Sequence, residues 1–176
     1  DQDGMMVSFI QSNYAGFGSG VCIPGTGIHL QNRAAGFSLD PDSPNVVGPQ
    51  KKPFHTIIPA FLMDNGSPLM SFGVMGGPMQ AQGHIQMVVR NHLWKQNPQE
   101  AIDAPRWRIE GGLDLVCEAS MNNQILSFLS ERGHNVYTKT SNDAFGFGGA
   151  QLIRRLKNGF YIGGSESRKD GHVVGF

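Results

Sequence analysis

Two adjacent glycines, Gly76 and Gly77, are the residues whose types and spacing best suit chemistry, because they stand between a strand-like and a helix-like stretch. Ser67–Val74 is typical of a buried strand, and Pro78 suits the first position of a helix, where its missing N–H costs nothing. Lacking side chains, the glycines let a ligand approach their N–H groups, and a helix N-terminus adds partial positive charge. These features fit the oxyanion of an acyl-transfer intermediate, or else a tight turn without chemistry.

The helix after this turn is predicted from an apolar stripe. Ala81, Ile85 and Val88 fall on one helical face together with His92, and two further apolar residues, Val89 and Leu93, lie beside that face.

Composition excludes several classes of function. The chain of 176 residues suits one compact domain or half of a larger one, and its formal net charge of zero gives no sign of a nucleic-acid or anionic-membrane footprint. No apolar run is long enough to span a bilayer, and no signal peptide is visible at the start, which leaves the cellular location unknown. We therefore expect no nucleic-acid or membrane partner.

Cysteine and histidine usage predicts no metal site. Cys22 and Cys117 are too few for a disulfide framework and lack metal-ligand spacing, so we expect buried thiols, with one disulfide as the alternative. The six histidines are dispersed along the chain, and none has the spacing of a known site.

The first residues predict a hairpin of which only one strand is present. Asp1-Gln-Asp-Gly4 is a turn signal, and Met5–Gln11 is strand-like. Since a hairpin needs two strands, we interpret the sequence as starting in the middle of one; a frayed N-terminus is the alternative.

Loops dominate the stretch that follows. Ser12–Gly20 is rich in glycine but lacks the spacing and lysine of a phosphate-binding loop. Val21–Leu30 predicts a turn and a short strand, and Gln31–Gly36 a loop. The irregular stretch 40–53 is typical either of a segment that borders a binding site or of a solvated surface loop.

The remaining elements predict an α+β fold. A capping box over Asn97–Glu100 starts a short helix that must end before Pro105. Ser120 is expected to cap a second helix, closed by Gly133, with a core face formed by Met121, Ile125, Phe128 and Leu129. Strands are predicted at Phe54–Met63, Trp107–Glu110, Leu113–Glu118, Val136–Lys139, Ala150–Leu156 and Phe160–Gly163, the last two joined at Asn158-Gly159. Helices would then cover a mostly antiparallel sheet.

Several segments together resemble the γ-glutamyltranspeptidase family. Lys52–Pro59 resembles its Lys/Arg-Pro-Leu-Ser-Ser-Met-x-Pro segment, and Val74–Gly77 resembles its Gly-Gly oxyanion segment. Glu100–Arg106 carries a similar Ala-Pro-Arg, and Gly164–Phe176 looks like the family's C-terminus. Phe17-Gly18 also falls where the family has Phe-Gly. The resemblance covers nearly the whole chain in order.

The resemblance implies the fold of N-terminal-nucleophile hydrolases, a four-layer αββα sandwich. In that family a precursor cuts itself, and the small subunit then begins with a catalytic Thr whose own α-amine can act as base. Residues 1–176 would be a single domain, the small subunit without its first few residues. The nucleophile would lie upstream of Asp1, and Thr26, Thr56, Thr138 and Thr140 are not substitutes for it.

The same resemblance implies the partner and the state of the isolated chain. The large subunit of the same precursor is the expected partner, no cofactor is needed, and a higher oligomer is left open. Alone, the chain is expected to be inactive, to expose a large apolar patch and to associate.

Individual residues take roles from this resemblance. Gly76 and Gly77 match the oxyanion pair, and Ser12 matches a Thr that supports the nucleophile. His55 and Thr56 match a Ser-Ser pair that holds the substrate α-carboxylate; Thr56 keeps a hydroxyl, whereas His55 departs from the pattern. A substrate-binding Asn of the family falls at Tyr14, with Asn13 beside it, so either the alignment slips there or the pocket is rebuilt.

The largest departure from the family lies at Gln31–Ser38, where the family has Asn-Asn-x-Met-Asp-Asp-Phe-Ser and holds the glutamyl α-amine. Here the stretch carries Arg33 and Gly36. Gly offers an ammonium no acceptor and Arg repels it, whereas Arg suits a carboxylate. Our hypothesis is an acyl group without a free α-amine, or with it placed elsewhere, as in the related glutaryl-type cephalosporin acylases.

Two classes of function are therefore compared. The first is an amide hydrolase or acyltransferase that takes a small γ-glutamyl or related acyl amide. The second is a non-catalytic relative that keeps the fold for binding or assembly. An unrelated Gly-rich β domain is a third option, which would not explain why these motifs occur in this order.

Overall fold

The computed structural model describes residues 1, 3–140 and 146–175. The chain divides into two compact units. The sheet unit comprises Asp1–Ser8 and Ile58–Phe176, and the loop unit comprises Phe9–Ile57. The prediction that residues 1–176 form one domain stays a prediction.

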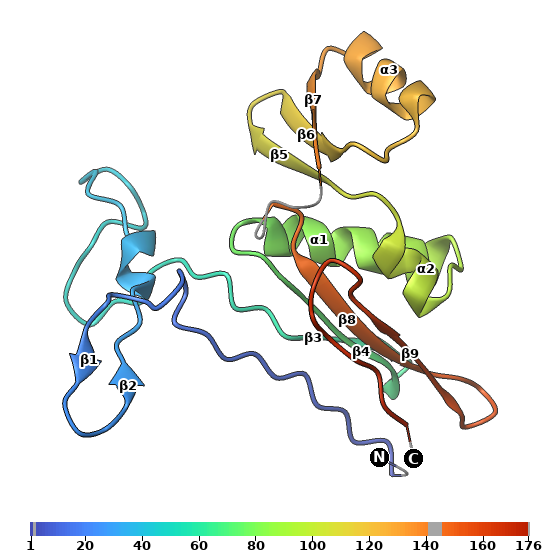
Figure 1. Ribbon diagram of the computed structural model, residues 1–176, viewed down its shortest axis with the longest axis horizontal. Coiled ribbons are helices and arrows are strands. Elements are labelled where there is room, and N and C mark those ends of the chain that lie inside the picture. The colour runs from blue at the N-terminus through green and yellow to red at the C-terminus, as the bar shows by residue number, and fades with distance from the viewer. Residues whose placement is uncertain (2, 141–145, 176) are drawn as a thin grey trace. The chain divides into compact units, whose positions relative to one another are not determined.

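A four-stranded antiparallel sheet forms the centre of the sheet unit (Figure 1). Its strands lie in the order β3 (Ala60–Asp64), β4 (Ser67–Met75), β8 (Gly149–Arg155) and β9 (Tyr161–Ser165). The β3–β4 hairpin turns through Asn65 and Gly66, both in the left-handed region at φ 49° and 82°. The predicted hairpin of the last two strands is confirmed, since β8 pairs antiparallel with β9.

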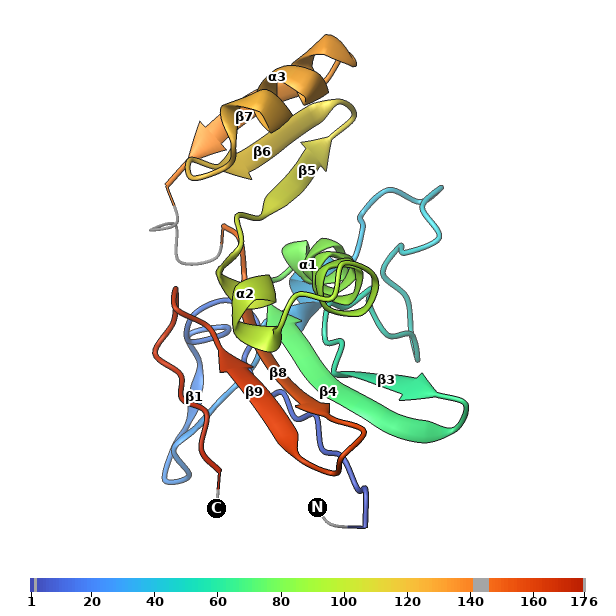
Figure 2. The ribbon, with the colours of Figure 1, turned by 90° about the vertical axis from the view of Figure 1, so that its right-hand side faces the viewer.

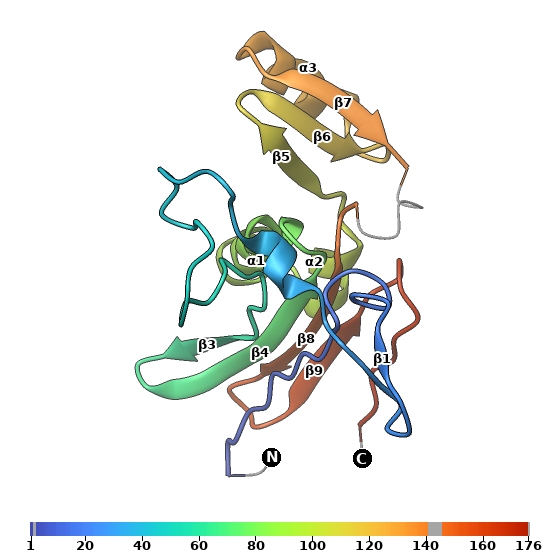
Figure 3. The ribbon, with the colours of Figure 1, turned by 90° about the vertical axis from the view of Figure 1, so that its left-hand side faces the viewer.

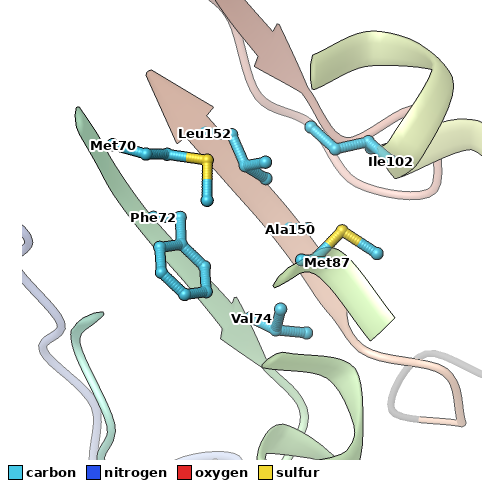
Figure 4. Packing of buried hydrophobic residues seen from close by; sticks show 7 residues of the cluster. All are labelled: Met70, Phe72, Val74, Met87, Ile102, Ala150 and Leu152. Atoms are coloured by element: carbon cyan, nitrogen blue, oxygen red, sulfur yellow. The ribbon is translucent and has the colours of Figure 1, made fainter. Parts of the chain in front are cut away.

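Two helical segments cover one face of this sheet (Figure 2). They are α1 (Met79–Val88), which continues as a π-helical stretch η2 (Val89–Leu93), and α2 (Pro98–Asp103). Alternate residues of β4 and β8 point toward them and form the main core with one residue from each helix (Figure 4), namely Met70, Phe72, Val74, Met87, Ile102, Ala150 and Leu152.

The packed face of α1 is not the apolar stripe that the sequence suggests. Its buried residues are Met79, Gln80, Gly83, Gln86 and Met87, whereas Ile85 is 62% exposed. A Cβ at Gly83 would lie 2.7 Å from Val74 Cγ1, so the glycine lets the helix approach the sheet closely. Close approach of the helix backbone to the sheet, and not hydrophobicity, therefore determines which face of α1 is buried.

A smaller sheet forms the rest of the sheet unit (Figure 3). β5 (Trp107–Gly111) pairs antiparallel with β6 (Asp114–Glu118), which pairs parallel with β7 (Asn135–Lys139). The parallel pair is joined through α3 (Asn123–Glu131), because parallel strands need a crossover.

The expected N-cap of α3 is wrong, and its expected core face is confirmed for Met121 and Leu129 but wrong for Ile125 and Phe128. Its N-cap is Asn122, whose side chain accepts from Gln124 N, and not Ser120. Ile125 and Phe128 are about half exposed, whereas Leu126 and Leu129 pack on the small core of Leu115, Cys117 and Met121. By contrast, the capping box of α2 is confirmed, with Asn97 and Glu100 satisfying each other's backbone N–H.

The predicted strand at Met5–Gln11 is also wrong. The turn before it forms, with Gly4 N donating to Asp1 O at 3.0 Å. The chain then runs extended beside β4, where Ser71 Oγ donates to Val7 O and Ser8 Oγ donates to Phe72 O. These side-chain bonds hold the segment, since no described strand pairs with it. The strand predicted from Phe54 begins only at Ala60, after Pro59.

The loop unit contains little regular structure. β1 (Cys22–Ile23) and β2 (Ile28–His29) form a small antiparallel hairpin, and η1 (Arg33–Gly36) is one turn of 3-10 helix. Both cysteines are free thiols; Cys117 is buried as expected, whereas Cys22, in β1, is exposed and the expectation of a buried thiol is wrong there. Among the described residues, no helix has the length and apolar character needed to cross a membrane.

Candidate active site

The Gly76–Gly77 turn leads from β4 into α1. Both glycines have positive φ, 140° and 60°, which side-chain-bearing residues rarely adopt. Their carbonyls already accept the first helical bonds, from Met79 N at 3.3 Å and Gln80 N at 3.0 Å. Within the described ranges, neither glycine's own N–H has a hydrogen-bond acceptor. As far as the described residues go, the turn therefore offers two unpaired backbone donors at a helix N-terminus.

Gly76 also needs to be glycine for steric reasons. A Cβ on it would lie 2.8 Å from the Cα of Gly148, the residue before β8. At Gly77, a Cβ would meet no described residue within 4 Å. Within the described structure, the turn is thus packed against the Gly148 backbone at Gly76 and open at Gly77.

Three of the other candidates meet in the loop unit. Arg33 Nη2 donates to Ser12 Oγ at 2.9 Å and to Ser12 O at 3.3 Å. The guanidinium carbon of Arg33 lies 5.3 Å from the centroid of the Tyr14 ring, a cation–π distance. In the described part of the chain, Nε and Nη1 of Arg33 have no partner, so three N–H bonds stay available.

Tyr14 and Asn13 shape the loop that carries Ser12. Tyr14 lies in the left-handed region at φ 79°, and its N–H donates to Ser12 Oγ at 3.4 Å. Asn tolerates this backbone better than Tyr does. Asn13 contributes its carbonyl, which accepts from Asn32 N at 3.2 Å.

His55 and Thr56 lie at the end of the loop unit. His55 is exposed, and its Nδ1 accepts from Ile57 N at 3.3 Å. Thr56 Oγ1 is buried and finds no partner among the described residues. A Cβ at Gly36 would lie 2.7 Å from Phe54 O, so η1 packs against the backbone just before His55.

The candidates therefore fall into two groups. Gly76 and Gly77 belong to the sheet unit, and the six others belong to the loop unit. Within the residues that the structure describes, no three His, Cys, Asp or Glu side chains gather as a metal site requires.

Sequence reasoning missed a buried ion cluster in the sheet unit. Arg106 and Glu166 form an ion pair at 2.5 Å with both side chains fully buried. Arg168 donates to both Glu166 and Glu118, at 2.7 and 2.6 Å. Arg106 stands in the Ala-Pro-Arg motif, and Glu166 and Arg168 stand in the C-terminal segment Gly164–Phe176, but nothing local shows that they meet.

Burial and mutual contact shift the pKa values in this cluster. Burial opposes ionisation of Glu166, but the charge of Arg106 and hydrogen bonds from Arg168, Ala150 N and Arg106 outweigh it and lower the pKa. Burial also lowers the pKa of Arg106. For Arg168, hydrogen bonds to Glu118 and Glu166 outweigh burial and raise the pKa. Burial, with Arg106 and Arg168 nearby, lowers the pKa of Arg90 to about 10.

Comparison with solved structures gives the class of protein. A cephalosporin acylase from Bacillus halodurans superposes with a TM-score of 0.89 at 47% identity, over 94% of this chain and 31% of that one. The fold is that of the N-terminal-nucleophile hydrolases. The family model described as gamma-glutamyltranspeptidase matches residues 1–176. The chain belongs to the γ-glutamyltranspeptidase family.

Two curated relatives match with 38% identity. One is a glutathione hydrolase-like YwrD proenzyme of Bacillus subtilis, aligned over 99% of this chain and 34% of its own length. The other is an oxamate amidohydrolase proenzyme of Klebsiella pneumoniae, aligned over 100% of this chain and 34% of its own length. The chain thus spans about a third of the length of these relatives.

Proposed function

We propose that this chain belongs to an amide hydrolase or acyltransferase that works through an acyl-enzyme. The observation that carries the proposal is the Gly76–Gly77 turn, whose two N–H groups have no acceptor within the described residues and lie at a helix N-terminus. Such donors stabilise the negative charge that develops on a carbonyl oxygen under nucleophilic attack. The curated relatives are named a glutathione hydrolase-like proenzyme and an oxamate amidohydrolase proenzyme, which supports this proposal.

The proposed nucleophile is a Thr that precedes Asp1 in the complete gene product. Its hydroxyl loses a proton to its own α-amine and attacks the substrate carbonyl. The tetrahedral oxyanion forms at the amides of Gly76 and Gly77. The α-ammonium of the Thr then gives its proton to the substrate's amide nitrogen, the C–N bond breaks, and the substrate's amine leaves while an ester forms on the Thr. Water, or an acceptor amine, attacks the resulting ester and regenerates the Thr. The balance of hydrolysis and transfer depends on which attacks faster.

Ser12 is proposed to support this nucleophile. Its Oγ accepts a hydrogen bond from Arg33, at 2.9 Å, and another from Tyr14 N. A hydroxyl both accepts and donates, and no acceptor for the Ser12 proton is present in the described part of the chain, so this proton can point to an oxygen of the nucleophile. Arg33 thereby fixes the direction in which that proton points.

Arg33 and Gly36 support a proposal about the acyl group. Among the residues that the structure describes, Arg33 has no partner at Nε and Nη1, and these donors suit a carboxylate. The Phe54 carbonyl leaves no room for a side chain at Gly36, so an acidic residue cannot hold an ammonium there. We therefore propose a substrate whose acyl group carries a carboxylate and no free α-amine. The name of the Klebsiella relative, an oxamate amidohydrolase, fits such a substrate.

The proposed partner is a large subunit cut from the same precursor. The relatives are named proenzymes, and this chain covers a third of their length. The first experiment is intact mass and N-terminal sequencing of the protein expressed from its complete gene. We expect two chains, the smaller beginning with Thr shortly before Asp1. A single uncleaved chain that hydrolyses no amide would instead favour the non-catalytic relative that serves binding or assembly.

A second experiment tests Arg33 with two matched substrates. Glutaryl and γ-glutamyl p-nitroanilides differ only in the α-ammonium group. We expect the wild-type protein to prefer the glutaryl compound, and Arg33→Ala to lower kcat/KM for it by about 10- to 100-fold, because a charged hydrogen-bonded pair is worth about 1.5–3 kcal/mol.

Arg33→Lys is the control, since it keeps the charge and loses the fork of donors. Its kcat/KM for the glutaryl compound should lie between those of wild type and Arg33→Ala. The proposed acyl preference would be abandoned if γ-glutamyl p-nitroanilide turned over well and insensitively to Arg33→Ala.

A further inference from the structure

The buried ion cluster reaches the backbone that supports the glycine turn. Arg106 Nη2 is bound to Glu166 and to Ile102 O. Its other terminal nitrogen, Nη1, donates to the carbonyls of Phe147 at 3.0 Å and Gly148 at 3.2 Å. One fully buried guanidinium thus joins the end of α2 to the two residues that lead into β8.

Glu166 binds the same stretch of backbone on the other side of Gly149, at Ala150. Its Oε2 accepts from Arg106 and also from Ala150 N, at 2.7 Å, two residues after Gly148. Arg168 and Glu118 complete the cluster, and Glu118 Oε2 accepts from Arg106 N at 2.7 Å. The residues on both sides of Gly149 are therefore fixed by a charged pair.

Gly148 in turn lies directly against the turn. It has φ 71°, and a Cβ on it would clash with the carbonyl oxygen of Met75 and lie 3.0 Å from Val74 Cγ1. The reciprocal contact is that of Gly76, whose absent Cβ would lie 2.8 Å from Gly148 Cα. Two glycine backbones thus touch where β4 ends, and any shift of Gly148 must move Gly76.

We propose that Gly148 and Arg106 are positioning residues for the Gly76–Gly77 oxyanion donors. This inference rests on the proposed function, because it assigns a role in the same acyl transfer. Neither residue touches substrate. Arg106 holds the Phe147–Gly148 backbone, and Gly148 sets the place of Gly76, so the donors stand ready before substrate arrives.

Arg90 offers a matched control for Arg106. Both donate to the carbonyls at the C-terminal end of α2, where helix carbonyls lack partners. Arg90 donates to Ala101 O, Ala104 O and Pro105 O, but no bond from it to Phe147 or Gly148 is present in the described residues. Loss of helix capping therefore affects both variants, and loss of positioning affects Arg106 alone.

The first test compares Gly148→Ala with Gly159→Ala in the complete gene product. Gly159 also has positive φ, 88°, but a Cβ there would meet no atom of the described residues within 4 Å. We expect Gly148→Ala to lower kcat about 10- to 100-fold with KM changed less than about threefold, since misplacement by about 1 Å can cost 10²-fold. Gly159→Ala should keep kcat within about twofold of wild type.

The second test is hydrogen exchange of the peptide that spans residues 72–80, which needs no activity. Arg106→Lys should speed exchange there at least about threefold, because Lys cannot hold both carbonyls and Glu166 together. Arg90→Lys should leave exchange in that peptide unchanged. The Arg106→Lys measurement also tests the proposal if Gly148→Ala does not fold.

The outcomes separate the two proposals. Wild-type protein that hydrolyses no amide overturns the proposed function, and with it the positioning role of Gly148 and Arg106 in acyl transfer. An active wild type whose Gly148→Ala variant keeps its kcat overturns the present inference alone. Equal exchange in Arg106→Lys and Arg90→Lys shows that Arg106 is only structural, and also overturns it.

Discussion

Glu166 accepts four hydrogen bonds although its carboxylate is fully buried. Oε2 binds Arg106 and Ala150 N, and Oε1 binds the backbone N and Nη1 of Arg168. A buried carboxylate is stable only when paired and fully hydrogen-bonded, and this one is. The contacts also explain why its pKa is lowered in spite of its burial.

This lowered pKa predicts how stability depends on pH. The folded pKa of Glu166 lies below its ordinary value of 4.5, so the folded state binds its proton less tightly than the unfolded state. The stabilisation is therefore present above about pH 4.5 and is lost as pH falls through the folded pKa. The free energy of unfolding, measured with urea between pH 7 and pH 3, should fall more steeply in wild type than in Glu166→Gln.

Glu110→Gln is the control for this measurement. Glu110 pairs with Arg108 at 2.6 Å, but its side chain is 48% exposed, and exposed pairs contribute about 0–1 kcal/mol. At pH 7, Glu166→Gln should cost about 3–5 kcal/mol, because it leaves Arg106 buried without its partner. Equal pH slopes for wild type and Glu166→Gln would contradict the assignment.

At the scale of elements, α1 packs on β4 through a glycine. Gly83 lies under Val74, whose Cγ1 and Cβ would be 2.7 and 3.3 Å from a Cβ at that position. Replacing Gly by Ala in a helix gains about 1 kcal/mol in propensity. Overpacking of a tight core costs about 1–3 kcal/mol. The cost of overpacking exceeds the gain in helix propensity, because β4 lies at the centre of the core and Val74 is fully buried.

We therefore predict that Gly83→Ala destabilises the protein by about 1 kcal/mol, measured as a lower urea midpoint with an unchanged slope. Gly111→Ala is the control, since a Cβ there would meet nothing within 4 Å and its φ is not in the left-handed region. That variant should be neutral or slightly stabilising. A Gly83→Ala variant as stable as wild type would show that α1 can shift freely on the sheet.

Helix α2 shows how a short element is held at both ends. Six residues are too few to form a stable helix alone. Its N-terminus has the reciprocal bonds of Asn97 and Glu100, and its C-terminal carbonyls accept from Arg90, Arg106 and Arg168. The three positive charges also suit the negative end of the helix dipole.

At the scale of the molecule, the sheet unit leaves one sheet face largely open. Ser71 alternates with buried Met70 and Phe72, so it points away from α1 toward the segment that carries Val7. On that side Phe61 and Ile153, which pair with Ser71, are 49% and 52% exposed. Apolar residues in such a position are typical of an interface, which fits the proposed large subunit.

The sequence by itself determined those structural features that depend on a few adjacent residues. The capping box at Asn97, the Asn158-Gly159 hairpin and the strand–Gly-Gly–helix transition all follow from local backbone preferences, and all are present. Family membership followed from motifs in order. The roles of Ser12, Arg33, His55 and Thr56 stay predictions, because sequence similarity assigns residues to positions of the family motif but does not show what their side chains contact.

The tertiary structure alone decided which residues meet. Ile85 and Gly83 both lie on α1, but Gly83 faces the sheet, because the helix backbone lies too close to Val74 for a larger side chain. Arg106 and Glu166 are 60 residues apart, and only the folded sheet brings their charges together in a buried place. Gly148 contacts Gly76 because β8 pairs with β4 in one register, with Met75 opposite Gly149. Such contacts depend on long-range packing, which no local pattern encodes.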